Sequence, residues 1–93
     1  MPTDEWTDPP KVFKYIHFEL INPEQNQRRY YLLSWQNTLL GPGVVRSYGR
    51  KGETQTLTVE PFATLGDAWP TLRAMIRSRI RHGYMIVKMN VER

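Results

Sequence analysis

The stretch TQTLTVEPFATLGDAWPTLRAMIRSRIRHGY (residues 54–84) decides the fold, because the spacing of its apolar residues changes once along its length. In its first seven residues apolar and polar side chains alternate, with Leu57 and Val59 on one side, which predicts a half-buried antiparallel strand. From Leu65 to Ile80 the apolar residues recur at three- and four-residue steps. This second spacing predicts an amphipathic helix that follows the strand.

The ends of the predicted helix carry suitable capping residues. Thr64 can accept a hydrogen bond as the N-cap residue, with Asp67 three residues later in the capping-box position. Gly83 suits the left-handed conformation that commonly ends a helix. Pro70 follows the first turn, where its missing N–H predicts a kink or a delayed start of the regular helix.

Four further segments are rich in β-branched and aromatic residues, which favour strands. They are Val12–Leu20, Arg28–Gln36, Val44–Tyr48 and Tyr84–Met89, with polar or glycine-rich turns between them, including Asn37–Gly43. Four strands, a helix and a last strand bury their apolar faces most simply as one antiparallel sheet covered by the helix. We therefore expect an α+β fold, with an antiparallel sheet of four to five strands packed against one amphipathic helix.

The chain of 93 residues is long enough for one domain. We expect residues 1–11, which are acidic and contain three prolines, to form a flexible leader, and residues 12–93 to form a single domain. No apolar run reaches the length of about 18 residues that a membrane span requires. The N-terminus also lacks the basic start and apolar centre of a signal peptide, so we expect a cytoplasmic protein without membrane contact.

The composition excludes several kinds of chemistry. Without cysteine the chain has no disulfide, thiolate metal site or cysteine nucleophile. His17 and His82 have no second metal ligand at a useful spacing and no neighbouring residues that suggest a catalytic triad. We therefore expect no metal, no cofactor and no enzymatic activity.

The charges favour an anionic partner. Residues 28–93 carry eleven basic and four acidic side chains, which gives a net charge of +7, whereas residues 1–27 are net negative. Nine of the thirteen basic residues are arginine. Because the guanidinium is a planar, permanently charged group that matches phosphate, this bias favours nucleic acid.

Two groups of residues are candidates for such contacts. In the first, three bases and an aromatic ring lie at a strand end beside a glycine: Arg46, Tyr48, Gly49, Arg50 and Lys51. Bases next to a stacking ring suit an unpaired or terminal nucleotide, although a hairpin with a packed cross-strand tyrosine would have the same sequence. In the second, Arg73, Arg77 and Arg81 share one helix face and could follow successive phosphates, or could simply be a solvated face.

These residues also resemble a known family. VVRSYGRKGETQT (residues 44–56), followed by PFATLGDAWPTLRAMIRSRIRHGY (residues 61–84), is similar to the WGR domain, as found in short stand-alone bacterial proteins. The matching positions are Gly49, Arg50, Gly52, Pro61, Phe62, Ala68, Gly83 and Tyr84. The resemblance covers roughly residues 12–88, and Tyr48 stands where the family has tryptophan.

The resemblance implies an antiparallel sheet with one helix against it. In DNA-dependent poly(ADP-ribose) polymerases this module contacts DNA at a break, where the tryptophan packs near the terminal nucleotide and the arginine contacts the backbone or neighbouring domains. Those roles would fall to Tyr48 and Arg50. The resulting hypothesis is a small non-enzymatic module that binds nucleic acid, DNA rather than RNA. The alternative is a protein-interaction adaptor whose basic face docks an acidic partner or an enzyme in trans.

Overall fold

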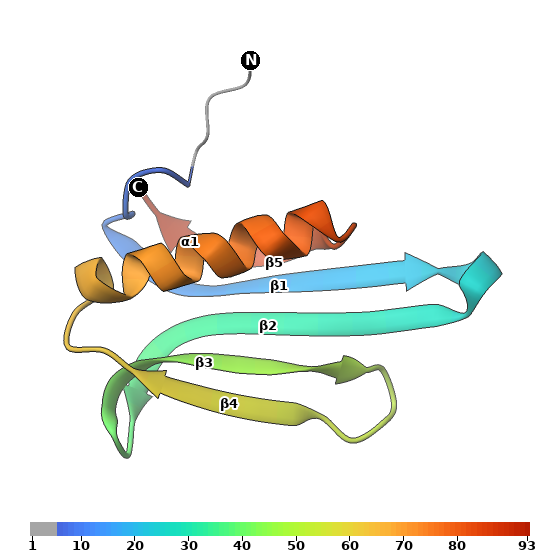
Figure 1. Cartoon of the computed structure of the whole chain (residues 1–93), viewed down its shortest axis with the longest axis horizontal. Coiled ribbons are helices and arrows are strands. Elements are labelled where there is room, and N and C mark those ends of the chain that lie inside the picture. Colours follow the sequence, from blue (N-terminus) through green and yellow to red (C-terminus); the bar gives the residue numbers. More distant parts are fainter. Residues whose placement is uncertain (1–5) are drawn as a thin grey trace.

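The computed structural model describes residues 6–93, which form one five-stranded sheet and one long helix (Figure 1). The elements are β1 (Val12–Asn22), a short 3-10 helix (Pro23–Gln25), β2 (Gln27–Thr38), β3 (Gly41–Arg50), β4 (Thr56–Pro61), α1 (Leu65–Arg81) and β5 (Met85–Glu92). The strand order is β4-β3-β2-β1-β5, and every neighbouring pair is antiparallel. The expected α+β class, antiparallel sheet and single long helix are confirmed.

The core lies between α1 and one face of the sheet. The helix buries four residues on one face, Ala68, Trp69, Leu72 and Ile76. They belong to the same cluster as buried residues of β1, β2 and β3, including Ile16, Phe18, Leu33 and Val44. Figure 1 shows α1 along β1, while β3 and β4 extend beyond it without a helix over them. Val44 of β3 is buried in this cluster, whereas the residues of β4 are mostly exposed.

Both predicted helix caps are present. The Asp67 N–H donates to Thr64 Oγ1 at 3.1 Å, and at the other end Gly83 has a φ of +91°. The N–H groups of Gly83 and Tyr84 donate back to the carbonyls of the last helical turn, each at 3.0 Å. This pair of bonds is a Schellman motif. Helix α1 begins at Leu65, ahead of Pro70, so the delayed start that the proline suggested does not occur.

The loop predicted over Asn37–Gly43 is largely strand. β3 begins at Gly41, and Gly43 pairs with Gln36 on one side and Pro61 on the other. A Cβ atom at Gly43 would lie 2.9 Å from the Glu60 carbonyl oxygen. The glycine therefore permits a close approach of β3 and β4. Gly43, which the sequence analysis assigned to a turn, lies inside a strand for this reason.

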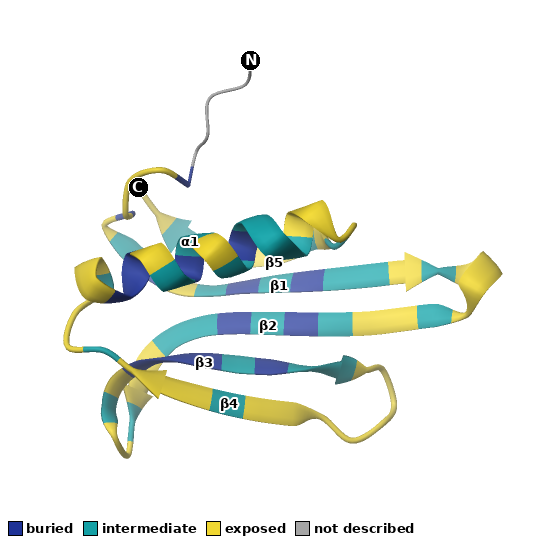
Figure 2. Cartoon of the chain, in the orientation of Figure 1, coloured by how far each residue is buried: buried dark blue, intermediate teal, exposed yellow. Residues whose placement is uncertain are grey.

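The strand predicted at Thr54–Glu60 is present as β4, but the prediction that it is half-buried was wrong. The alternation is present, but Leu57 and Val59 are 58% and 39% exposed. β4 is an edge strand beyond the reach of α1, and these two residues lie on the opposite face from the helix, as judged from their pairing with Ser47 and Val45. Figure 2 shows β4 almost wholly exposed.

Among the described residues, one that precedes the predicted domain boundary at Val12 packs against the core. Trp6 is buried, with its ring centroid 6.3 Å from that of Trp69, and the Trp69 indole N–H donates to the Thr7 carbonyl at 3.3 Å. The Arg93 guanidinium lies 4.8 Å from the centre of the Trp6 ring. The rest of the predicted leader, residues 1–5, lies outside the described residues.

Candidate nucleic-acid interface

Three of the predicted site residues point to the helix side of the sheet. Arg46, Tyr48 and Arg50 alternate along β3, so their side chains share one face. Tyr48 pairs with Tyr31 of β2, whose side chain is buried in the core. The helix-side face of β3 thus carries two guanidiniums and a phenol ring.

The Tyr48 ring packs across the strands. Its centroid is 5.3 Å from that of Tyr31, and the two planes are 18° apart, which is a stacked geometry. Tyr48 is also packed against the buried cluster. This is the cross-strand contact that the sequence analysis kept as an alternative, so the ring has a structural role independent of any ligand.

Two arginines meet at Tyr31. The Arg79 guanidinium carbon of α1 lies 4.8 Å from the centre of the Tyr31 ring and 5.1 Å from that of Tyr84. Arg46 donates from Nε to Thr58 Oγ1 at 3.0 Å and from Nη1 to the Tyr31 hydroxyl at 3.5 Å. Within residues 6–93 no carboxylate forms an ion pair with either guanidinium. We call Tyr31, Arg46, Tyr48 and Arg79 the arginine–tyrosine cluster.

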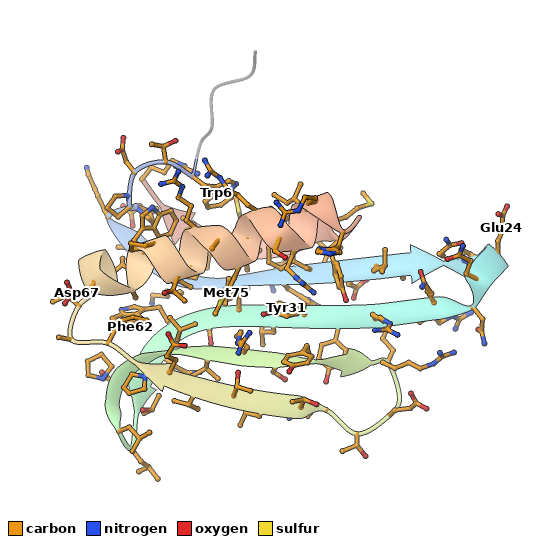
Figure 3. All side chains as sticks on the ribbon, viewed as in Figure 1. Trp6, Glu24, Tyr31, Phe62, Asp67 and Met75 are labelled. Carbon is orange, nitrogen blue, oxygen red and sulfur yellow. The ribbon has the colours of Figure 1, made fainter. Side chains whose placement is uncertain are left out.

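Three residues of the arginine–tyrosine cluster, Tyr31, Arg46 and Arg79, line an open groove of about 480 Å³ between α1 and the sheet, and Tyr48 lies beside it, stacked on Tyr31. Figure 3 labels one residue from each wall, Met75 on α1 and Tyr31 on β2. The groove is lined by Tyr31, Arg46, Pro70, Thr71, Ala74, Met75, Ser78 and Arg79. A smaller hollow of about 290 Å³ shares Arg79 and adds Arg29 and His82. Arg79 therefore joins two adjacent hollows, both lined by arginine.

The remaining strand-end residues, Gly49, Arg50 and Lys51, do not line this groove. Arg50 is exposed and donates to the Asn26 carbonyl at 2.9 Å, and its Nε lies 3.7 Å from the Glu53 carboxylate. Lys51 forms an ion pair with Glu19 at 2.8 Å. A Cβ at Gly49 would come within 3.3 Å of the Thr54 carbonyl oxygen, so close backbone packing also explains a glycine at this position.

The predicted helix stripe does not join the groove. None of Arg73, Arg77 and Arg81 lines it. Because two residues turn through about 200° around a helix, Arg73 lies opposite the groove residue Thr71. The helix arginine in the groove is Arg79, which the site prediction omitted. Its signal was present in the sequence, since Arg79 continues the apolar stripe three residues after Ile76.

Residues 6–93 contain neither a metal-binding cluster nor a membrane-spanning helix. Among residues 6–93 no group of three or more histidine or acidic side chains is placed to hold a metal ion. In the same part of the chain no helix is both long and apolar enough to cross a bilayer.

Comparison with known proteins places the chain in a family. No curated protein and no solved structure gave a match. The WGR domain family matches over residues 15–91, a range that contains β2, β3, β4 and α1 entirely and most of β1 and β5. Since this match spans nearly the whole chain, the protein belongs to the WGR domain family.

Proposed function

We propose that this protein is a small, non-enzymatic module that binds DNA by its backbone or ends, through the arginine–tyrosine cluster. WGR domains are nucleic-acid-binding modules in poly(ADP-ribose) polymerases and related proteins. The family therefore supports nucleic acid as the partner, and the geometry of the groove supports the place of contact.

The observation that carries the proposal is the pair of guanidiniums held at Tyr31. Arg46 and Arg79 contact opposite parts of the same residue, the hydroxyl and the ring, and no carboxylate of residues 6–93 forms an ion pair with them. Guanidiniums with unused donors bind phosphate oxygens through charge-assisted hydrogen bonds. Arg46 is held by its hydrogen bonds and Arg79 by its two ring contacts, so they lose less conformational entropy on binding than free surface arginines do.

The residues of the arginine–tyrosine cluster, and Arg50 outside it, then have separate tasks. Arg46 and Arg79 bind phosphates inside the groove, and Arg50 binds the backbone at the strand end, where the Asn26 carbonyl orients it. Tyr48 offers a ring to the sugar or base of a terminal nucleotide while it stacks on Tyr31. The stripe of Arg73, Arg77 and Arg81 adds positive charge at a distance.

Salt should weaken the binding strongly. With about four to six phosphate contacts, we expect log affinity to fall against log salt concentration with a slope of roughly −4 to −5. Fluorescence anisotropy of a labelled duplex, titrated at several salt concentrations, measures this slope. No binding at low salt, or a flat response, contradicts the proposal. Binding of an acidic protein that DNA does not displace would support the adaptor instead.

Variants of Tyr48 separate its stacking on nucleic acid from its packing on Tyr31. We expect Tyr48→Leu, which fills much of the space without a ring, to weaken binding to a duplex end by about 1–3 kcal/mol, the contribution of one stacked base. Tyr48→Trp, with the larger ring, should bind at least as tightly as the parent.

The melting temperature is measured on the same samples. If Tyr48→Leu loses stability but binds the end as well as the parent does once folded, Tyr48 has a structural role only. Tyr48→Ala serves as the reference for lost packing, because it removes both the stacked ring and most of the side-chain volume.

A further inference from the structure

The sheet is split at one end. The ladder between β1 and β2 starts at their shared turn and stops at the pair Tyr15 and Ser34. Beyond that pair β1 remains hydrogen-bonded only to β5, and β2, from Trp35 onward, only to β3. Figure 1 shows β2 bending away from β1 here. The backbone edges that the two strands turn towards each other are therefore unpaired with one another.

This split forms a cleft of about 380 Å³, which we call the Trp35 cleft. Its walls include Lys11 and Lys14 from the β1 side and Trp35, Gln36 and Asn37 from β2. Both lysines are exposed, and no carboxylate in residues 6–93 forms an ion pair with them. Trp35 is half-buried, whereas Trp6 and Trp69 are only 4% and 3% exposed. The cleft therefore combines free positive charge with the one tryptophan that solvent reaches.

We propose that the Trp35 cleft is a second nucleic-acid contact that holds an unpaired nucleotide, a proposal that rests on the proposed function. The base stacks on Trp35, and the phosphates beside it bind Lys11 and Lys14. The Asn37 amide presents both a donor and an acceptor to the base edge. A flat ring, two cations and an amide in one cleft suit a nucleotide, which has a base, a phosphate and hydrogen-bonding edges.

The position of the cleft allows one strand to use both sites. Tyr31 and Trp35 lie four residues apart on the same face of β2, which is about 13 Å along the strand. A nucleic-acid chain that leaves the arginine–tyrosine cluster reaches the Trp35 cleft within a few nucleotides. The cluster then binds the end of the duplex, and the cleft binds the unpaired extension beyond it.

The test compares a blunt duplex with the same duplex carrying a short single-stranded extension. We expect the extended duplex to bind the parent protein more tightly by about 5- to 150-fold, the equivalent of one stacked base. Tryptophan fluorescence should change only with the extended duplex, because Trp35 is the accessible indole. Trp35→Leu should remove both the preference and the fluorescence change.

Lysine variants test the cleft without disturbing the core. Lys11→Ala and Lys14→Ala should each reduce the salt slope for the extended duplex by about 0.7 to 0.9. The matched control is Lys88→Ala, an exposed lysine on β5, which should leave the slope unchanged.

The outcomes separate the two proposals. The Trp35 cleft proposal is wrong if the two duplexes bind with equal affinity, or if anisotropy rises with the extended duplex while fluorescence stays unchanged. In either case the proposed function is not contradicted. A Lys11→Ala or Lys14→Ala slope equal to that of Lys88→Ala also overturns the cleft proposal. If neither duplex raises the anisotropy of the parent protein at low salt, the proposed function fails and the cleft proposal fails with it.

Discussion

Replacing Leu72 with alanine is expected to lower the free energy of unfolding by about 2–5 kcal/mol. Leu72 is fully buried in the cluster between α1 and the sheet, so the variant loses its apolar burial and leaves a cavity. Trp69→Ala should cost a similar amount, because it removes the contacts with Trp6 and Phe13 as well. Small domains have only about 5–15 kcal/mol of stability, so either loss is large.

Chemical denaturation of each variant measures the effect. The matched control is Leu39→Ala, the same substitution at a fully exposed position in the turn between β2 and β3, which should change stability by no more than about 0.5 kcal/mol. If Leu72→Ala and the control have the same free energy of unfolding, α1 does not pack on the sheet through this face.

Replacing Arg46 and Arg79 together with glutamine is expected to weaken DNA binding by about 100-fold or more. A hydrogen bond to a charged group contributes about 1.5–3 kcal/mol, which is roughly tenfold or more in affinity for each arginine. Glutamine keeps part of the aliphatic stem against Tyr31, so the fold is largely retained. The salt slope should also fall by about 1.8, since two phosphate contacts are lost.

The control for this double variant removes the same charge from helix arginines that do not line the groove. Arg73 and Arg81 changed together to glutamine should alter affinity far less, because neither residue lines the groove. Anisotropy titrations on all samples, with melting temperatures, make the comparison. Equal losses in the two double variants would mean that the protein binds through its overall charge rather than at the arginine–tyrosine cluster.

The elements themselves were predictable because they depend on local chemistry. The apolar spacing from Leu65 to Ile80 and the caps at Thr64 and Gly83 define α1 without reference to the rest of the chain. The Gly-Arg pair at Gly49 and Arg50, with the glycine and aromatic positions around it, was sufficient to indicate the WGR family. Strand ends were less predictable, since Gly41 to Gly43 enter β3 by pairing with β2, and Gly43 also pairs closely with β4.

The composition of the site could not be predicted in the same way. Arg46, Arg50 and Lys51 lie within six residues of one another in the sequence, yet Lys51 binds Glu19 while Arg46 lies in the groove. The regular spacing of Arg73, Arg77 and Arg81 marked a helix face, but spacing alone does not say which flank of the helix faces β3.

By itself, the sequence determined the class of fold, the helix with its caps, the basic character of residues 28–93 and the WGR family. These properties depend on composition and on spacing within one element. Only the tertiary structure decided which side chains meet: Arg79 with Arg46 at Tyr31, Trp6 with Trp69, and Lys11 and Lys14 with Trp35. Such contacts join residues far apart in the chain, and they depend on how α1 crosses the sheet and where β1 and β2 separate.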